Sequence, residues 1–443
     1  MRPIAFRNYM LVVLLIIQAY NYVDRQALGL VLQNIKMDLD LSDTQLGLLT
    51  GIPFAFFYAV MGIPIARWAD RGDRVAIISA SIAVWSALVA LCGKATNFAQ
   101  LMFLRAGVGV GEAGSFPPAQ SLIPDYFSRA ERPWANSIYM LNGPLSALVG
   151  LFVAGWLNEL YGWRTMFLLL GIPGLALAPL AWLSLGEPRR TRSKSPDRER
   201  KSNLQPIAAT SPLKQPSLLE GSRTLWAYPS FRYLFFYVAI QNFLDVGIMQ
   251  FQPAYLIRSY GLETGELGTW YAAVFGIGAF VGIYTGGRLA SRYAANDERL
   301  QLRVAAGMYC IYALNAALVY LTTNRYLAFA LLAVGTVVAN VFTGSLFATL
   351  QTLVPPRLRA LSSTSIFLFT NLVGTGLGPL AVGALSDGLR PWLAEGSLRV
   401  ALLATCPGYF LGAWYLWKTS QTITSDLNRA QEQVAGDECL EVG

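Results

Sequence analysis

The feature that most constrains this chain is a series of apolar runs, each of about 20 residues or more. An α-helix of that length crosses the apolar interior of a lipid bilayer, because it rises about 1.5 Å per residue. The runs lack the apolar and polar alternation of membrane β-strands, so a β-barrel is excluded. A composition of 54% hydrophobic and only 14% charged residues also excludes a soluble globular domain. We therefore predict an all-α membrane protein.

Twelve transmembrane helices are predicted, separated by polar or charged loops. Their predicted ranges are 9–34, 43–68, 74–93, 98–125, 133–159, 163–186, 230–257, 265–289, 303–322, 326–353, 360–386 and 395–417. A hydrophilic stretch rich in Arg, Lys, Ser and Pro separates the sixth span from the seventh. The predicted organisation is an N-terminal six-helix half (1–186), a basic linker (187–229), a C-terminal six-helix half (230–418) and a tail (419–443).

Most lysines and arginines lie in the connecting loops, and alternate loops hold more of them. The loop between the second and third spans carries Arg67, Arg71 and Arg74, whereas the next loop carries only Lys94. The positive-inside rule then places the linker, the tail and both termini in the cytoplasm. The net charge of +8 is thus explained by topology and does not indicate nucleic-acid binding. The short loops favour a bacterial protein of the inner membrane.

The two halves repeat each other at a nearly constant spacing. The segment NYVD at 21–24 returns as NFLD at 242–245. Two glycine matches follow at a common, slightly larger spacing, Gly150 with Gly378 and Gly155 with Gly383. Parallel repeats around a central site are typical of secondary transporters. A receptor or a static scaffold has no need of two similar halves.

The fourth predicted span carries Arg105 and Glu112, seven residues apart on one helix face and about 10 Å apart along the axis. Charged groups inside a membrane usually mark the path of a substrate or an ion. Counting residues from the span ends places Asp24 and Arg105 at similar depth, so we expect them to pair. The same count places Glu112 near the midplane, where we expect it to reach toward a cavity. Arg25 points elsewhere, about 100° around the first helix from Asp24.

The second half lacks most of these charges. Asp245 matches Asp24, but Val246, Ala333 and Asn340 stand where the first half has Arg25, Arg105 and Glu112. We hypothesise that protonation of Asp24 or Glu112 changes how strongly Arg105 is held, which couples the proton to the conformational equilibrium. With no histidine in the chain, a side-chain proton near neutral pH falls to a carboxylate. The alternative is an ion pair that only holds the bundle together.

Two further groups of residues are predicted to act in transport. The segment Gly62–Arg74 ends the second span, and its charges Asp70, Arg71 and Arg74 form a predicted gating latch. In it, Asp70 meets a helix N-terminus or an arginine of the other half; the alternative is a set of solvated topology charges. The candidates for lining a substrate cavity are Arg25, Tyr139, Asn142, Asn242, Asp245, Asn340 and Asn371.

No cofactor or metal is predicted, because the four cysteines form no close pair and no metal-binding motif is present. The segment Gly109–Gly114 fits the nucleotide-binding pattern G-x-G-x-x-G. It lies within a span and follows no strand, so close helix packing explains these glycines better.

Three segments carry a resemblance to a known family: NYVDRQ at 21–26, LSDTQLG at 41–47 and RAGVGVGEAG at 105–114. They resemble the Spinster family of lipid transporters. The twelve spans and Gly62–Arg74 resemble the wider major facilitator superfamily, over about residues 9–417. The resemblance implies alternating access, a substrate of the lysophospholipid or sphingosine-1-phosphate type and, in some members, proton coupling. It maps functional charges to Asp24, Arg105 and Glu112, and the latch to Asp70, Arg71 and Arg74; in the second half, Ser291 stands at the position of the latch acid.

The sequence therefore predicts a proton-coupled secondary transporter for an amphiphilic, lipid-like molecule. Its expected partners are that substrate, the proton and membrane lipids, and it is expected to act as a monomer. The alternatives are a multidrug or other small-molecule transporter, and a membrane receptor or scaffold that transports nothing. An enzyme is not expected, because the chain has no histidine, metal motif or serine elbow.

Overall fold

The computed structural model describes residues 4–128, 131–187, 223–293, 297–341 and 369–442, together with Leu346, Thr349 and Leu353. Within these ranges the regular elements are helices, as predicted. The first group is α1 (Ile4–Leu39), α2 (Asp43–Thr50), α3 (Ile52–Arg71), α4 (Arg74–Cys92), α5 (Phe98–Glu112), α6 (Phe116–Tyr126), α7 (Arg132–Tyr139), α8 (Asn142–Leu145), the π-helical η1 (Ser146–Gly150) and α9 (Leu151–Ser184).

The second group of elements begins at Pro229. It is α13 (Pro229–Tyr260), α14 (Thr264–Tyr271), the π-helical η2 (Ala272–Ile277), α15 (Gly278–Tyr293), α16 (Glu298–Leu321), α17 (Arg325–Val341), the π-helical η4 (Asn371–Leu377), α20 (Gly378–Leu393), the 3₁₀-helical η5 (Ala394–Gly396), α21 (Ser397–Thr405) and α22 (Gly408–Val442). The last helix continues through the predicted tail.

Local sequence signals explain where several helices begin and end. Ser42 and Gln45 form a capping box at the start of α2, in which each side chain accepts from the other residue's backbone N–H. Gly261 ends α13 in the left-handed conformation, with φ of 63°. Gly162, with φ of 77°, breaks α9 between the ranges predicted for the fifth and sixth spans. A side chain with a Cβ is rarely found at such φ values.

Seven continuous helical stretches of the described residues are long and apolar enough to cross a membrane. Two of them, Trp134–Ser184 and Asn371–Arg429, each cover more than one predicted span. The spans predicted at 326–353 and 360–386 extend into residues outside the described ranges. The count of twelve helices therefore stays a prediction. The predicted linker also falls mostly outside the described residues, between 188 and 222.

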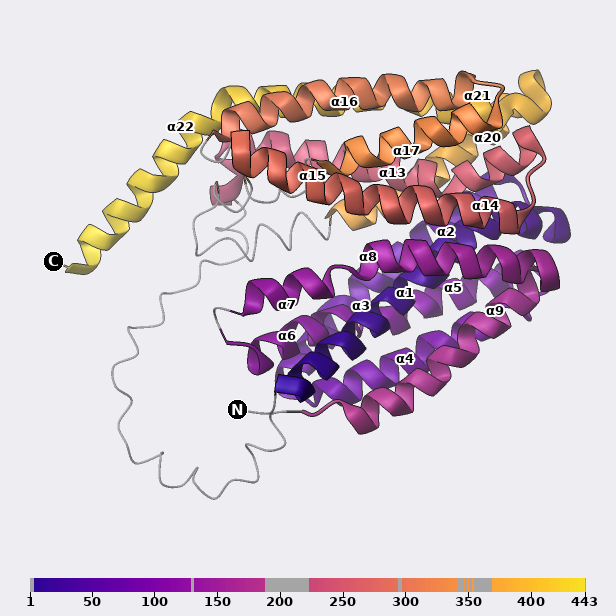
Figure 1. Ribbon diagram of the computed structural model, residues 1–443, viewed down its shortest axis with the longest axis horizontal. Coiled ribbons are helices and arrows are strands. Elements are labelled where there is room, and N and C mark those ends of the chain that lie inside the picture. The colour runs from indigo at the N-terminus through magenta and orange to yellow at the C-terminus, as the bar shows by residue number, and fades with distance from the viewer. Residues whose placement is uncertain are drawn as a thin grey trace.

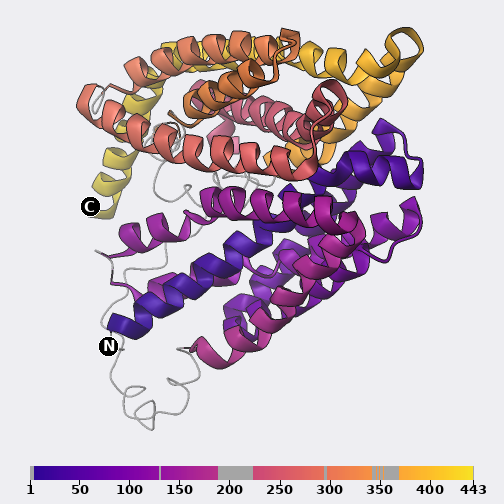
Figure 2. The ribbon, with the colours of Figure 1, turned by 45° about the vertical axis from the view of Figure 1, so that its right-hand side comes forward.

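The helices form two groups that meet at one end of the molecule and diverge toward the other. Figures 1 and 2 show α1–α9 in one group and α13–α22 in the other. We call the end near Asp43 and Thr264 the closed end, because helices of the two groups pack together there. We call the opposite end, which holds the start of α1 and helix α6, the terminal end (Figure 1). About ten residues before the ends of both helices, α1 touches α13 where Gly29 meets Gln250.

Two equivalent glycine contacts join the groups at the closed end. A Cβ added to Gly155 of α9 would lie 2.5 Å from the Thr264 carbonyl oxygen of α14. At the matching position of the second group, a Cβ on Gly383 of α20 would collide with the Asp43 carbonyl oxygen of α2. Only residues without a Cβ allow backbones to approach this closely. The match of Gly155 with Gly383 in the sequence repeat thus corresponds to matching contacts between the groups.

Two acidic side chains also cross between the groups in equivalent positions. Glu159 of α9 accepts from the backbone N–H of Gly265 at 2.7 Å, at the start of α14. Asp387 of α20 accepts from the backbone N–H groups of Asp43 and Thr44 at 3.1 and 2.7 Å, at the start of α2. A carboxylate is stabilised at a helix N-terminus by the unpaired N–H groups and the helix dipole. Each group therefore caps a helix of the other.

An ion-pair network also joins the two groups at the closed end. It lies at the start of α2 and has no equivalent at the start of α14. Arg258 of α13 donates to both carboxylate oxygens of Asp43, at 2.8 and 2.9 Å. Lys36 lies 2.6 Å from the same carboxylate, and Ser386 of α20 donates to it at 2.7 Å. The residue that matches Asp43 in the second group is the uncharged Thr264, so this network has no counterpart there.

Candidate functional site: a buried ion-pair cluster

Asp24 and Arg105 form an ion pair inside the first group of helices. The distance between Arg105 Nη1 and Asp24 Oδ2 is 2.7 Å, and both side chains are almost completely buried. Asp24 lies on α1 and Arg105 on α5. Counting residues from the ends of the predicted spans had placed them at similar depth. The predicted contact is therefore confirmed.

Arg25 and Glu112 form a second ion pair between the same two helices. Arg25 Nε donates to Glu112 Oε2 at 2.7 Å, and the terminal Arg25 nitrogen Nη2 contacts the same oxygen. Glu112 was expected to reach toward a cavity, but it is fully buried and Arg25 covers it. Arg25 lies about 100° around α1 from Asp24, so it avoids the Asp24–Arg105 pair, and its long side chain reaches Glu112 further along α5.

The two pairs together form a cluster with two positive and two negative groups, which we call the charge cluster: Asp24, Arg25, Arg105 and Glu112. Two of its carboxylate oxygens, Asp24 Oδ1 and Glu112 Oε1, are buried and have no hydrogen-bond partner among the described residues. The Asp24 carboxyl group is close enough to Glu112 to interact with it electrostatically. Two such oxygens would both gain a partner if they shared one proton.

Aromatic rings pack against the Arg25 side of the charge cluster. The Arg25 guanidinium lies 4.4 Å from the centre of the Phe54 ring and 5.0 Å from that of Tyr58. Such positions over ring faces stabilise a cation through the ring quadrupole. Arg25 is nevertheless the most exposed member, with 19% of its side chain accessible compared with at most 6% for the other three.

A small cavity adjoins Asp24 on the side away from α5. It has a volume of about 10 Å³ and is lined by Tyr20, Val23, Asp24, Trp85, Ser86, Val89 and Leu170. A cavity of this size is close to the minimum that holds one water molecule. The hydroxyl of Ser86 at its wall has no hydrogen-bond partner among the described residues.

Of the predicted latch residues, only Arg74 can be placed by its contacts, because the side chains of Asp70 and Arg71 lie outside the described residues. Arg74 is buried, and its Nη2 lies 2.6 Å from both Asp125 and Glu187. Both partners belong to the first group of helices. Among the described residues, the hydrogen bonds and ion pairs of Arg74 all lie within the first group.

Two predicted cavity residues of the first group are buried. Tyr139 is fully buried and donates its hydroxyl to Gln18 at 3.1 Å. Asn142 is also buried and donates to the Tyr139 carbonyl oxygen at 2.6 Å. Both bond within the first group, so neither lines an accessible surface in this structure. The prediction that they line a substrate cavity stays a prediction.

The cavity candidates of the second group are only partly buried. Asn242 of α13 lies against Gly374 of η4, and Asn371 lies on η4 itself. Asn340 donates to the Thr336 carbonyl oxygen of its own helix, at 2.9 Å. Asp245 accepts from the hydroxyl of Tyr409 at 2.6 Å. Their predicted role in a substrate cavity stays a prediction.

The sequence reasoning missed two features. It did not pair Arg25 with Glu112, although both positions were singled out, because helix rotation in the bundle cannot be read from one sequence. It also did not assign a role to Asp43, Arg258 or Asp387 at the closed end. Asp43 does belong to the LSDTQLG segment, which was a signal that this position matters.

The sequence model of the Major Facilitator Superfamily matches residues 14–379. This chain belongs to the Major Facilitator Superfamily. The family fits the helical architecture described above, and it makes the chain an integral, multi-pass membrane protein and a transporter, not an enzyme. In the part of the chain that the structure describes, no group of acidic or cysteine side chains could hold a metal ion.

Relatives within the superfamily have several named activities. An MFS-type efflux pump of Mycolicibacterium smegmatis is 32% identical over 94% of this chain and 93% of its own length. A probable L-galactonate transporter of Escherichia coli is 26% identical over 86% of this chain and 82% of its own length.

A solved structure shows the same fold in a defined conformation. It is a bacterial homologue of the human lysosomal transporter Spinster, crystallised in an inward-facing and unoccupied conformation. The TM-score is 0.81 at 29% identity, and the match covers 96% of this chain and 99% of that chain. The predicted resemblance to the Spinster family is confirmed.

Proposed function

We propose that this superfamily transporter moves an amphiphilic, lipid-like molecule of the lysophospholipid or sphingosine-1-phosphate type, and that a proton drives it. The charge cluster carries the proposal. With both acids ionised, its two carboxylates balance its two guanidinium groups. One added proton removes one negative charge and leaves the buried cluster with a net charge of +1. An uncompensated charge is costly inside a membrane, so a second, anionic ligand then binds more favourably.

Arg25 is the group that we propose receives this ligand. It is the most accessible member of the charge cluster, and its partner Glu112 is one of the two acids that a proton can neutralise. A guanidinium released from a carboxylate can bind a phosphate with the same forked geometry. Proton and anionic headgroup then favour each other's binding, and this thermodynamic coupling is reciprocal.

One observation supports a path for the proton, and another supports alternating access by movement of the two groups of helices. The small cavity beside Asp24 has room for roughly one water molecule, which can carry a proton to the carboxylate. The contacts at the closed end and the likeness to an inward-facing structure support an inward-facing state.

We propose that the terminal end faces the cytoplasm of a bacterial cell, across the inner membrane. The chain acts as a monomer. In this arrangement Asp70, Arg71 and Arg74 form the latch of the opposite, outward-facing state.

A second candidate is efflux of drug-like molecules, which the name of the mycobacterial relative favours. The same charge cluster can couple a proton to such a substrate. The two candidates differ in the ligand and not in the mechanism, so a transport assay with both kinds of molecule separates them.

The experiment is proton flux into liposomes that contain the purified protein and a pH-sensitive dye. Added lysophosphatidylcholine is expected to drive proton movement with the wild type and not with Glu112→Gln or Asp24→Asn. The exposed Glu395 at the closed end is the matched control, and Glu395→Gln should behave as the wild type. Transport that ignores both pH and the two cluster substitutions would refute the coupling.

A further inference from the structure

The second group of helices holds a membrane-embedded acid outside the charge cluster. Asp245 lies at the midpoint of α13, a helix that extends from Pro229 to Tyr260 and is long enough to span a bilayer. Its side chain is half-buried. It matches Asp24 of the first group by position in the repeat.

The partners of these two acids differ. Asp24 is neutralised by Arg105, but an alanine, Ala333, stands at the matching position of the second group. None of the ion pairs formed by the described residues includes Asp245. A carboxylate in the membrane interior without a positive partner is costly. It is therefore a group that gains by binding a cation.

The surroundings of Asp245 consist of neutral and aromatic groups. The Tyr409 hydroxyl of α22 donates to Asp245 Oδ1 at 2.6 Å. The ring of Tyr312 on α16 packs edge-on against that of Tyr409, with centroids 4.8 Å apart. Tyr309 continues the row, 6.2 Å from Tyr312, and contacts Tyr237 of α13 at 5.3 Å. A carboxylate among tyrosine rings is the chemistry that recognises amines and quaternary ammonium groups.

We propose that Asp245, with Tyr409 and Tyr312, binds the positively charged group of the transported molecule, an amine or a quaternary ammonium. The proposal rests on the transport function proposed above and specifies the substrate class further.

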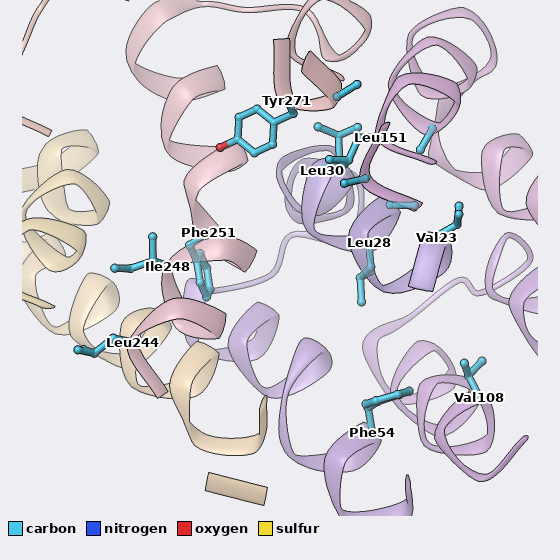
Figure 3. Packing of buried hydrophobic residues seen from close by; sticks show 14 of the residues in the cluster. Val23, Leu28, Leu30, Phe54, Val108, Leu151, Leu244, Ile248, Phe251 and Tyr271 are labelled. Atoms are coloured by element: carbon cyan, nitrogen blue, oxygen red, sulfur yellow. The ribbon is translucent and has the colours of Figure 1, made fainter. Parts of the chain in front are cut away.

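Arg25 and Asp245 lie on two helices that touch each other. The two helices touch where Gly29 meets Gln250. Arg25 precedes this contact by four residues and Asp245 by five, so each lies about 6 to 8 Å from it along its helix. Both groups are thus at similar depth on adjacent helices, but Asp245 lies about 140° around α13 from Gln250 and faces α22. Apolar side chains of the two helices lie around this level (Figure 3): Val23, Leu28 and Leu30 on α1, and Leu244, Ile248 and Phe251 on α13.

The test uses two probe ions of the same shape and opposite charge, tetraphenylphosphonium and tetraphenylborate. Binding of each to the purified full-length protein is measured by equilibrium dialysis at pH 7. We expect Asp245→Asn to weaken tetraphenylphosphonium binding by about tenfold or more, because it removes the charge that the cation contacts. Tetraphenylborate binding should stay unchanged, which also shows that the variant is folded. Asp245→Glu, which keeps the charge, should retain most of the cation binding.

Three outcomes would overturn the proposal: no measurable tetraphenylphosphonium binding by the wild type, unchanged cation binding by Asp245→Asn, or an equal loss of both probe ions. The last result would assign Asp245 a structural role. This assay contains neither a proton gradient nor a lipid substrate. Its failure is therefore distinguishable from failure of proton-coupled lipid transport, which the liposome experiment measures.

Discussion

A buried arginine in a membrane helix is stable only when a nearby group compensates its charge. Arg105 has Asp24 at 2.7 Å and is almost completely buried. Removing one partner of such a pair is more damaging than removing both, because it leaves an uncompensated buried charge. The stability of this pair can therefore be separated from its part in transport.

At this scale we predict that Asp24→Asn lowers the free energy of unfolding by about 3 kcal/mol. The double variant Asp24→Asn/Arg105→Gln should recover much of that loss, because no unpaired charge remains. Thermal unfolding in detergent measures both effects. Transport should be lost in both variants. A double variant less stable than the single one would contradict the charge-compensation argument.

At the scale of elements, the irregular parts of the helices repeat along with the sequence. The break at Gly51 between α2 and α3 matches the start of η2 at Ala272, at the spacing that relates NYVD to NFLD. The π-helical η1 and η4 likewise overlap at the spacing that relates the matched glycines. Such interruptions often occur at functional sites, because they redirect a helix. Here they lie next to the glycines at which the two groups meet.

We predict that Gly155→Ala and Gly383→Ala open the closed end without unfolding the protein. Each added methyl would overlap a backbone oxygen of the other group, at a cost of about 1–3 kcal/mol in that state only. Distances between spin labels on α6 and at the start of α16 should shorten, because the terminal end closes when the closed end opens.

Gly307 provides the matched control for this experiment. It lies in the middle of the apolar helix α16, and a Cβ there would meet nothing within 4 Å. Gly307→Ala should leave the label distances unchanged. Equal distances in all three variants would show that the glycine contacts do not set the conformation.

At the scale of the whole molecule, the closed end is held by contacts that each group makes to the other. Glu159 and Asp387 cap α14 and α2 in equivalent ways, and Asp43 adds the pairs with Arg258 and Lys36. The contacts that join the two groups must break before the groups can separate at this end. They therefore stabilise the present state relative to the opposite one.

We predict that the double variant Glu159→Gln/Asp387→Asn raises the population of the opposite state by roughly thirtyfold, because each cap contributes about 1 kcal/mol. The measurement is the rate at which a maleimide reagent labels a cysteine introduced at Thr50, which is buried in the present state. Labelling should become faster in the double variant.

The control for the caps is Glu263, an exposed residue that precedes α14 and makes no capping hydrogen bond with its side chain. Glu263→Gln removes a carboxylate near the same helix and should leave labelling at the wild-type rate. If Glu263→Gln and the double variant labelled equally fast, the effect would be one of charge and not of capping.

By itself, the sequence determined the class of the protein. The apolar runs required membrane helices, because no other structure satisfies the backbone in lipid at that length. Counting residues from the ends of the predicted spans also predicted that Asp24 pairs with Arg105. Both are properties of spacing along a helix, which a single chain displays directly.

Only the tertiary structure decided what each charged or small group contacts in another helix. The orientation of α1 in the bundle allows Arg25 to bind Glu112. The packing of the two groups brings Asp387 to the start of α2. Tyr139 and Asn142 became buried for the same reason. Contacts of this kind depend on angles and separations between helices, which the residue spacing within one helix does not fix.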